Sequence, residues 1–400
     1  MNPSTVHHLL DPGEAARLLA ALPAARPVQG VTIESVWAKP GRHFNVCYRI
    51  DDGAAGRLAS LCIVNESEAA RAARRIERRA AHNAETGAGV SVLAAVDVLA
   101  QAFPFDYRLD HLGDCLSPGV VHDVLGDGDV DACEVAAYRP GMRCQLRYSA
   151  GGSARAYGKI AVERDPGRRR RVHRELCAAT ATTTLRLPAL LGTVEALGLD
   201  VVAAAGGRSL HDTLADAPDA QPVAEVTRAL AELHAGVPAL PDRVHTANDE
   251  FALVESWTSW MRGIEPAMAR PLARGFAALA AAMPRTVPTT FAHRDFYDRQ
   301  VLLDGSRSWL LDVDTACTGD PELDLGNFLA HLFLRGLQWE RVAAHRELEA
   351  AALDAYGSRA RRDVTHWYRR ASLLRLSCVY QLRPRWRPVV TALLDEAMLP

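Results

Sequence analysis

Short apolar runs separated by turn residues dominate the first part of the chain. Runs at residues 31–37 and 44–50 flank the turn sequence Lys39-Pro40-Gly41. A third run at residues 58–64 precedes a helical pattern over residues 67–84. Short runs bounded by Pro and Gly are typical of β-strands, whereas apolar positions three and four apart indicate a helix. The pattern therefore predicts a hairpin, a third strand and a helix.

The same order of elements returns about one hundred residues later. Residues 38–49 align with residues 138–149, and residues 58–64 align with residues 156–162. We interpret this as a degenerate internal repeat. Only the second copy is chemically equipped, because its third strand carries Lys159, whereas the corresponding position of the first copy falls near Leu61.

A second helix and a hinge are predicted after this repeat. Asp165-Pro166-Gly167 is a helix start, and Glu175 lies on that helix. Two further strands and a crossing segment are expected over residues 187–205, followed by Gly206-Gly207 as a hinge between two lobes. Helical patterns fill most of the remaining chain. The sequence therefore predicts an α+β protein with a small mixed lobe followed by a helical lobe.

The chain of 400 residues is long enough for two or three domains. We expect an N-terminal cap domain at residues 1–125, an N-lobe at residues 126–205 and a helical C-lobe at residues 206–400. The Gly- and Asp-rich segment at residues 125–129 marks the first boundary. Our hypothesis is that the cap packs on the second copy and shapes access to the active site.

A polar loop followed by a predicted hairpin is the most informative stretch of the second half. Residues 293–300 form the loop, and the apolar runs around Asp304-Gly305 predict a tight hairpin. The hairpin would hold Asp295 and Gln300 at one end and return Asp312 to the same end. Phosphoryl transfer requires such a set, because an acidic group must accept the hydroxyl proton while a carboxylate and an amide hold Mg²⁺.

Composition excludes several classes of protein. The hydrophobic content of 48%, the charged content of 24% and the net charge of −2 are ordinary for a globular protein and give no general attraction for nucleic acid or anionic membranes. We find neither a signal peptide nor an apolar run long enough to span a membrane, so we expect a cytoplasmic protein. The eight cysteines lack zinc-site spacing and are expected to be reduced thiols.

Lysine is almost absent from the chain. Of the 46 basic residues only Lys39 and Lys159 are lysine. Lysine is a compact charge that enters sites where the guanidinium group does not fit. The presence of Lys159 on a predicted strand therefore indicates a chemical role.

Three ordered motifs carry a resemblance to a known superfamily. They are His293-Arg294-Asp295 with Gln300, Leu311-Asp312-Val313-Asp314, and Gly319-Asp320-Pro321-Glu322-Leu323-Asp324. Together with the upstream lysine, they resemble the aminoglycoside phosphotransferase and choline kinase superfamily over about residues 131–335. The resemblance implies a protein-kinase-like, two-lobed fold, here preceded by an α+β cap domain that resembles a degenerate N-lobe.

The resemblance also implies roles for the residues of the second half. Asp295 would be the catalytic base or the carboxylate that orients the substrate hydroxyl. Gln300 and Asp312 would hold Mg²⁺, and Asp314 would either see a second metal ion or cap a turn. Asp324 would brace the catalytic loop, in which we interpret His293 as a packed histidine bonded to the backbone.

Other residues would hold the nucleotide. Lys159 would contact the α- and β-phosphates of ATP, and Glu175 would orient Lys159. The turn at Gly141, Met142 and Arg143 would cover the phosphates with backbone amides. Backbone groups near the hinge, at Val202 and Ala204, would pair with the adenine edge; this last set completes the predicted nucleotide site.

Two residues depart from the superfamily pattern. Arg294 replaces the usual glycine, and Gln300 replaces asparagine. Glutamine keeps the amide oxygen and adds a methylene, so metal coordination is retained with a shifted backbone. Maltokinases of the same superfamily are similar in having glutamine at this position and an extra N-terminal domain.

Three functions are consistent with these residues. The first is an ATP- or GTP-dependent kinase whose acceptor is a hydroxyl of a sugar, an aminoglycoside-like antibiotic or a biosynthetic intermediate. The second is a nucleotide-binding pseudokinase that regulates a partner protein, against which Lys159, Asp295 and Asp312 argue together. The third, an arginine-rich nucleic-acid binder, is the weakest because the net charge is near neutral. The sequence does not indicate an oligomeric state.

Overall fold

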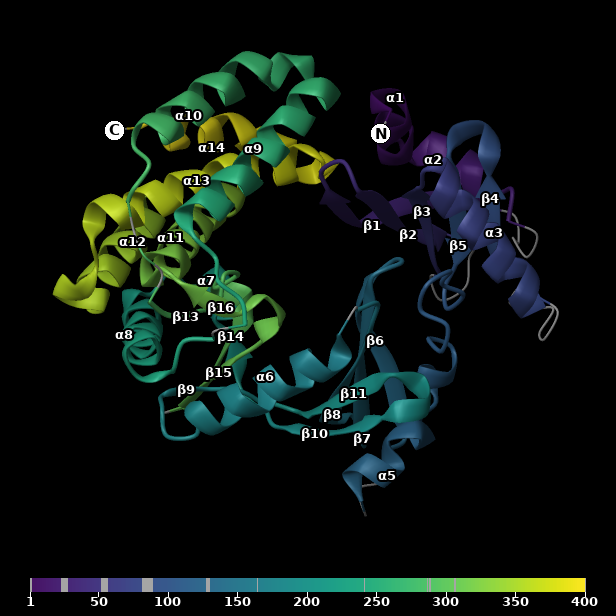
Figure 1. The fold of residues 1–400 in the computed structure, drawn as a ribbon, viewed down its shortest axis with the longest axis horizontal. Coiled ribbons are helices and arrows are strands. Elements are labelled where there is room, and N and C mark those ends of the chain that lie inside the picture. Colours follow the sequence, from purple (N-terminus) through teal and green to yellow (C-terminus); the bar gives the residue numbers. More distant parts are fainter. Residues whose placement is uncertain are drawn as a thin grey trace. The chain divides into compact units, whose positions relative to one another are not determined.

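The computed structural model describes residues 2–22, 28–51, 57–80, 89–126, 130–163, 165–240, 242–285, 287, 289–305 and 307–399. The chain divides into two compact units (Figure 1). The first comprises Met1–Arg164 and Leu190–Ala204, and the second comprises Asp165–Ala189 and Ala205–Pro400. The division into three domains at residues 125/126 and 205/206 stays a prediction, and residues 127–129 of its first boundary lie outside the described residues.

Two five-stranded sheets make up most of the first unit. The first sheet has the order β1-β2-β3-β5-β4, and the second has the order β6-β7-β8-β11-β10. The elements are α1 (Pro3–Leu10), α2 (Pro12–Leu19), β1 (Gly30–Lys39), β2 (His43–Asp51), β3 (Arg57–Ile63), α3 (Glu66–Ala80), β4 (Val90–Leu93), β5 (Val98–Ala102), α5 (His122–Leu125), β6 (Ala132–Arg139), β7 (Arg143–Ala150), β8 (Ser153–Ala161), β10 (Leu190–Val194) and β11 (Leu199–Ala203).

The predicted internal repeat is confirmed by these two sheets. Each begins with an antiparallel hairpin, adds a third strand, and receives its last two strands in the same reversed order. The hairpins turn at Gly41 and Gly141, which have φ angles of 68° and 67°. A register shift interrupts the first strand of each copy, between Ile33 and Ser35 in the first and, two positions nearer the turn, between Val135 and Ala137 in the second.

Strand register refines the comparison of the two copies. On β8, Lys159 lies opposite Gln145 of β7 and Asp200 of β11. The matching level of the first copy contains Asn45, Cys62 and Leu99. The residue equivalent to Lys159 is therefore Cys62, one position beyond Leu61, and the first copy has an uncharged level where the second has a lysine and a carboxylate.

The first copy packs on the second, as we expected of a cap. Buried Cys47 and partly buried Leu58 and Phe103 belong to the same apolar cluster as Leu146 and Tyr148 of the second sheet. The Asn45 side chain also donates a hydrogen bond to the carbonyl oxygen of Pro140 at 2.6 Å. The effect of the cap on access to the active site stays a prediction.

Helices make up most of the second unit. Its small sheets have the orders β12-β14-β15-β9 and β13-β16. The elements are α6 (Pro166–Ala179), β9 (Leu185–Arg186), β12 (Arg208–Ser209), α7 (Leu210–Asp216), α8 (Ala220–Gly236), α9 (Ala247–Ile264), α10 (Ala269–Ala281), β13 (Thr290–Ala292), β14 (Val301–Asp304), β15 (Arg307–Leu310), β16 (Cys317–Gly319), α11 (Pro321–Gln338), α12 (Val342–Tyr356), α13 (Arg362–Gln381) and α14 (Val390–Ala397).

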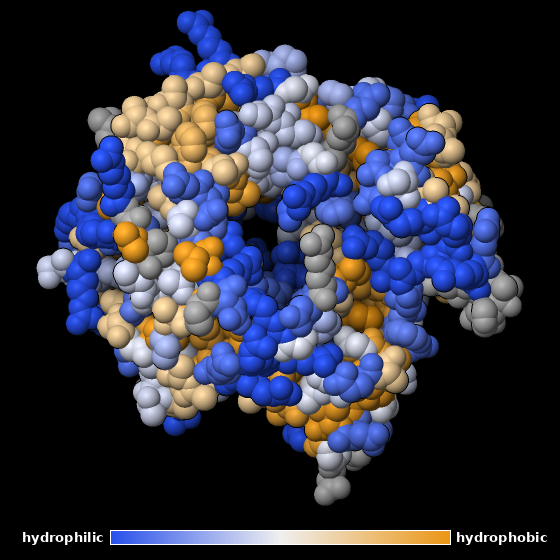
Figure 2. All heavy atoms as spheres, viewed as in Figure 1, coloured by the Kyte–Doolittle hydropathy of each residue, from blue (hydrophilic) through white to orange (hydrophobic). Residues whose placement is uncertain are grey.

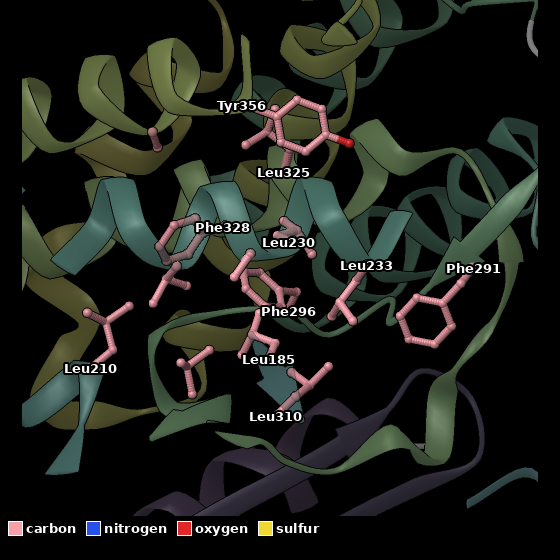
Figure 3. Packing of buried hydrophobic residues seen from close by; sticks show 14 of the residues in the cluster. Leu185, Leu210, Leu230, Leu233, Phe291, Phe296, Leu310, Leu325, Phe328 and Tyr356 are labelled. Atoms are coloured by element: carbon pink, nitrogen blue, oxygen red, sulfur yellow. The ribbon is translucent and has the colours of Figure 1, made fainter. Parts of the chain in front are cut away.

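The core of the second unit encloses part of the polar loop at residues 293–300. Leu230 and Leu233 from α8 and Phe328 from α11 pack around the loop residue Phe296 (Figure 3). The rings of Phe296 and Phe328 meet edge to face at 5.4 Å. Burial of such an aromatic side chain favours folding by about 2–3 kcal/mol. The loop is therefore anchored to the core by its own phenylalanine.

Two further observations concern the cysteines and the capacity of the helices to span a membrane. All eight cysteines are free thiols, as expected. Across the described parts of the chain, no helix has both the length and the apolar character needed to cross a membrane.

Candidate active site

The loop at residues 293–300, called the catalytic loop below, lies between β13 and β14. Ala292 at the end of β13 pairs with Cys317 of β16, which fixes the start of the loop. Val301 at the start of β14 pairs with Leu310 of β15, which fixes its end. Strand pairing at both ends therefore determines where the loop begins and where it returns.

His293 organises the catalytic loop from inside. Its side chain is fully buried, with 0% exposure. Nδ1 lies 3.2 Å from the backbone nitrogen of Asp295, which donates to it, so Nε2 is the nitrogen that donates to the carbonyl oxygen of Leu311 at 2.8 Å. These bonds confirm our interpretation of His293 as a packed residue bonded to the backbone.

Asp324 braces the loop from the first turn of α11, as predicted. Its carboxylate accepts the backbone N–H groups of His293 at 2.6 Å and of Arg294 at 2.7 Å. His234 of α8 lies 3.1 Å from the same carboxylate. One buried side chain therefore ties the loop to two helices.

Arg294 adopts a backbone conformation that suits glycine. Its φ angle of 69° lies in the left-handed region, where a Cβ atom is sterically costly. Among the described residues, its buried Nε atom has no hydrogen-bond partner. The geometry explains why the superfamily pattern has glycine at this position and shows that the arginine is strained.

The hairpin brings Gln300 and Asp312 to the same end, as predicted. The backbone N–H of Leu311 donates to the carbonyl oxygen of Gln300 at 2.8 Å, and Gln300 itself donates to Tyr297 at 2.9 Å. Asp312 follows Leu311 with a left-handed φ angle of 57°, which turns the chain away from β15. Because Leu311 also accepts from His293, the segments that carry Asp295, Gln300 and Asp312 are joined by hydrogen bonds at a single residue.

Oxygen atoms dominate the side chains that could hold a metal ion. The described residues contain no group of three His, Cys, Asp or Glu side chains suited to a metal ion. Mg²⁺ is usually held by only one or two carboxylates, together with substrate phosphates and water. The carboxylate of Asp312 and the amide of Gln300, which is 8% exposed, fit this requirement. Asp314 accepts a bond from Arg243 through its backbone carbonyl at 3.0 Å, and its choice between a second metal and a turn cap stays a prediction.

A buried ionic network that the sequence did not indicate supports the end of the loop. Asp298 accepts hydrogen bonds from Arg335 of α11 at 2.9 Å and contacts the His211 ring. Burial acts to raise the pKa of Asp298, but the charge of Arg335 and the bond from His211 outweigh it and hold the pKa well below its usual range. Asp298 is therefore an ionised residue that fixes the loop two positions before Gln300.

Lys159 lies in the first unit, on the partly exposed face of β8. Its cross-strand neighbour Asp200 is buried and accepts a bond from the Thr193 hydroxyl at 2.9 Å. Sequence reasoning missed Asp200, because only strand register places it opposite Lys159. Glu175 lies on α6 in the second unit, where its side chain is 58% exposed and 3.9 Å from Arg171 of the same helix. The pairing of Glu175 with Lys159 therefore stays a prediction.

The turn predicted to cover the phosphates is held by a carboxylate from outside the second sheet. The backbone N–H of Gly141 donates to Asp106 at 2.7 Å, and that of Met142 donates to Arg139 at 3.0 Å. A Cβ atom at Gly141 would lie 2.8 Å from the Tyr107 ring, so glycine is required by space as well as by its φ angle. The contacts of Gly141, Met142 and Arg143 with a nucleotide stay predictions.

Asp106 is a third acid, after Asp298 and Asp200, that sequence reasoning missed. It is 1% exposed and also accepts bonds from the Tyr138 hydroxyl at 2.8 Å and from the backbone of Arg108 and Leu109. Tyr138 begins the alignment with the first copy, but its partner lies in the segment that links the two copies. No local pattern could have paired them.

The predicted hinge coincides with the passage between the units. Val202 lies inside β11 with register partners on both sides, and the N–H of Ala204 donates to Arg155 at 3.2 Å. The chain enters the second unit after Ala204. Gly207 has a φ angle of 94°, and a Cβ atom there would lie 2.1 Å from the Leu303 carbonyl oxygen. The adenine contacts of Val202 and Ala204 stay predictions.

Comparison with known proteins identifies the family. Residues 151–369, more than half of the chain, match the phosphotransferase enzyme family. Among proteins with curated descriptions, no sequence shows significant similarity to this chain. The match includes Lys159 and all three motifs of the second half, whereas the cap lies outside it, so the similarity to maltokinases stays a prediction.

Solved structures show the fold. An apo crystal structure of a thermostable mutant of aminoglycoside phosphotransferase APH(4)-Ia has a TM-score of 0.50 and 18% identity, covering 70% of this chain and 97% of that chain. A choline/ethanolamine kinase family protein from Mesorhizobium loti has a TM-score of 0.44 and 18% identity, covering 68% and 86%. The predicted α+β, protein-kinase-like fold is confirmed by the first of these structures.

Proposed function

Because this chain belongs to the phosphotransferase enzyme family, we propose that it transfers the γ-phosphoryl group of ATP to a hydroxyl group of a small molecule. The observation that carries the proposal is the meeting of two hydrogen bonds at Leu311, one from His293 and one to Gln300. These bonds hold the catalytic loop against the segment that carries Asp312. A base and two oxygen ligands fixed on one framework are the parts that phosphoryl transfer requires.

Asp295 is the proposed base. Its backbone N–H is held by His293, which fixes the start of its side chain. A carboxylate in this position would accept the proton of the substrate hydroxyl, or orient that hydroxyl for attack on the γ-phosphorus. His293 is unsuited to this role, because both of its ring nitrogens are bonded to the backbone.

Asp312 and Gln300 are the proposed ligands of Mg²⁺. When bound, the ion would supply charge neutralisation for the phosphate oxygens. The work of the protein is to fix two oxygen donors in place, which it does through the β14–β15 pairing and the bond from Leu311 to Gln300. Asp314 is a candidate for a second ion.

Lys159 is the proposed contact to the α- and β-phosphates. It projects from the middle of β8, where Gln145 and Asp200 on the neighbouring strands limit its side-chain directions. We propose that Glu175 orients it from α6 when nucleotide is bound. The turn at Gly141, Met142 and Arg143 would cover the phosphates, and Val202 and Ala204 would border the adenine.

The acceptor is proposed only as a class. A sugar, an aminoglycoside-like antibiotic and a biosynthetic intermediate with a free hydroxyl all suit the chemistry of Asp295. A nucleotide-consumption screen with sugars, aminoglycosides, amino alcohols and nucleosides, run with ATP and with GTP, would identify both substrates. We expect cytoplasmic action on a small molecule, without nucleic acid or a membrane as partner.

Three substitutions test the chemistry. Asp312→Asn should abolish Mg²⁺-dependent phosphoryl transfer, and Asp295→Asn should lower kcat by at least about 10²-fold while nucleotide binding is kept. Lys159→Arg keeps the charge and changes the shape, so it should raise the nucleotide KM. Turnover that is unchanged in both aspartate variants would sink the assignment. Nucleotide binding without turnover against every acceptor would favour the alternative, a pseudokinase that regulates a partner protein.

A further inference from the structure

A stripe of arginines follows one face of α3 in the cap. Arg71, Arg74, Arg75 and Arg78 are three, four and seven positions apart, a spacing that places side chains on the same side of a helix. The surface over α3 is correspondingly hydrophilic (Figure 2). A stripe of four arginines would repel itself unless anions lie nearby.

A cavity adjoins this stripe. It has a volume of about 590 Å³, within the range of small-molecule sites. Residues from α3, from the start of β2 and from the segment after β5 form its wall. They are His43, Glu68, Arg71, Ala72, Arg74, Arg75, Glu77, Arg78, Tyr107 and Arg108.

Acidic side chains leave much of the positive charge of this arginine cavity uncompensated, because its wall carries five arginines and only two carboxylates, Glu68 and Glu77. Asp110 holds Arg75, with its Oδ1 2.8 Å from Nε. Glu68 is engaged at the helix start, where it accepts the N–H of Asn65 at 3.3 Å. In the part of the chain that the structure describes, Arg71, Arg74 and Arg108 form no ion pair with a carboxylate.

His43 on the cavity wall has a lowered pKa, mainly because it is partly buried. Burial lowers the pKa of His43, Glu68 opposes this effect, and the nearby charge of Arg108 adds to it. A neutral imidazole on the cavity wall would leave the arginines as the cationic groups that a ligand meets.

The second copy shares two of these arginines and differs at the other two positions. Counted from the helix starts at Glu66 and Pro166, Arg71 and Arg74 correspond to Arg171 and Arg174, whereas Arg75 and Arg78 correspond to Glu175 and Ala178. Strand register makes Cys62 the counterpart of Lys159. The first copy therefore has neither the lysine nor the glutamate of a kinase N-lobe, and an arginine, Arg75, stands at the position of the glutamate.

We propose that the arginine cavity binds a small anion that carries phosphate groups, at a site separate from the phosphotransfer site. Planar guanidinium groups form paired hydrogen bonds with phosphate oxygens, and several of them can surround one phosphate. The cavity has room for more than a single phosphate group. This site does not depend on the proposed function, because all of its residues lie in the cap.

The test is calorimetric titration of the full-length protein with inorganic pyrophosphate, without Mg²⁺ or nucleotide. Pyrophosphate should bind the unmodified protein at one site. The double substitution Arg71→Ala/Arg74→Ala should weaken binding by at least about tenfold, because it removes two charge-assisted contacts. Arg71→Lys/Arg74→Lys keeps the charge and should weaken binding less, and it tests the site even if the alanine variant fails to fold.

Two controls locate the binding. Arg270→Ala/Arg274→Ala removes the same charge from an exposed face of α10 and should leave binding unchanged. Lys159→Ala removes the proposed phosphate contact of the active site and should also leave it unchanged. Loss of affinity in Lys159→Ala or in the α10 variant to the extent seen in the alanine cavity variant would overturn the proposal. So would the absence of binding to the unmodified protein at about 1 mM pyrophosphate, the weak end of specific affinities.

Discussion

The backbone amide of Gly141 donates a hydrogen bond of 2.7 Å to the carboxylate of Asp106. The donor lies in the turn that we propose covers the nucleotide phosphates, and the acceptor follows the last strand of the cap sheet. The carboxylate also receives the Tyr138 hydroxyl from the strand before the turn. A residue of the cap therefore fixes the conformation of the turn between β6 and β7.

Replacing Asp106 should loosen this turn. Asp106→Asn substitutes a donor group for one acceptor oxygen and leaves buried N–H groups unpaired, which should lower the free energy of unfolding by about 1–3 kcal/mol. The nucleotide KM should rise more than kcat falls. Urea denaturation and steady-state kinetics measure the two effects.

Tyr138→Phe is the matched control for that change. It removes one donor to Asp106 and leaves the bond from Gly141 intact, so the nucleotide KM should stay at its original value. An equal rise of KM in both variants would show that the bond to Gly141 is not what matters.

The length of the Gln300 side chain should be essential. Its backbone is fixed by bonds with Tyr297 and Leu311, so Gln300→Asn would withdraw the amide oxygen by one methylene. A displacement of about 1 Å in a catalytic group can lower the rate about 10²-fold. We expect a kcat loss of that order and a higher Mg²⁺ requirement, measured by kinetics over a range of Mg²⁺ concentrations.

Gln300→Glu preserves the length and the oxygen and should retain Mg²⁺ dependence. Normal kcat and normal Mg²⁺ dependence in Gln300→Asn would show that Gln300 is not a ligand of the metal ion, whatever the result for the glutamate variant.

Arg294 offers a measurement of backbone strain. Arg294→Gly and Arg294→Ala both remove the side chain, but only glycine adopts the φ angle of 69° without steric cost. The glycine variant should therefore be about 1 kcal/mol more stable than the alanine variant. Chemical denaturation of the two variants measures the difference, and equal stability would contradict the strain.

Asp298 should make stability depend on pH. Its pKa is depressed in the folded protein, so its contribution is fully present above the unfolded-state value of about 4 and is lost as the pH falls toward the folded-state value. Asp298→Asn leaves the buried charge of Arg335 without its partner and should cost about 3–5 kcal/mol at pH 7.

Denaturation at pH 7, 4 and 3 checks this expectation. The difference between the parent protein and Asp298→Asn should shrink below pH 4, because the unfolded parent binds a proton at Asp298 there while the folded parent does not, which lowers the stability of the parent. A difference that stays constant over this range would show that Asp298 is not the titrating group.

Local patterns predicted the elements and the repeat, because turn residues and apolar periodicity act over a few positions. They also placed Gln300 and Asp312 together, since one short hairpin joins them. The polar pairs that hold the site could not be predicted from local patterns. Asp106 and Gly141 are 35 residues apart, and Asp298 and Arg335 are 37 apart, so only tertiary packing brings them together.

The comparison of the two copies shows the same limit at finer scale. Sequence identities aligned Lys159 with a position near Leu61, whereas hydrogen-bonded register assigned it to Cys62. A shift of one residue on a strand moves a side chain to the opposite face. The position of Asp200 opposite Lys159 could not be predicted for the same reason, because it depends on strand register.

The two hydrogen bonds that the catalytic loop donates to the Asp324 carboxylate have a consequence for hydrogen exchange. An amide proton exchanges with solvent only when its hydrogen bond opens. The backbone amides of His293 and Arg294 both donate to the carboxylate of Asp324. Asp324 belongs to α11, which is buried from Glu322 to Gly336. Both protons should therefore exchange at the same slow rate, set by the detachment of α11, so that the loop and the helix form one cooperative unit of unfolding.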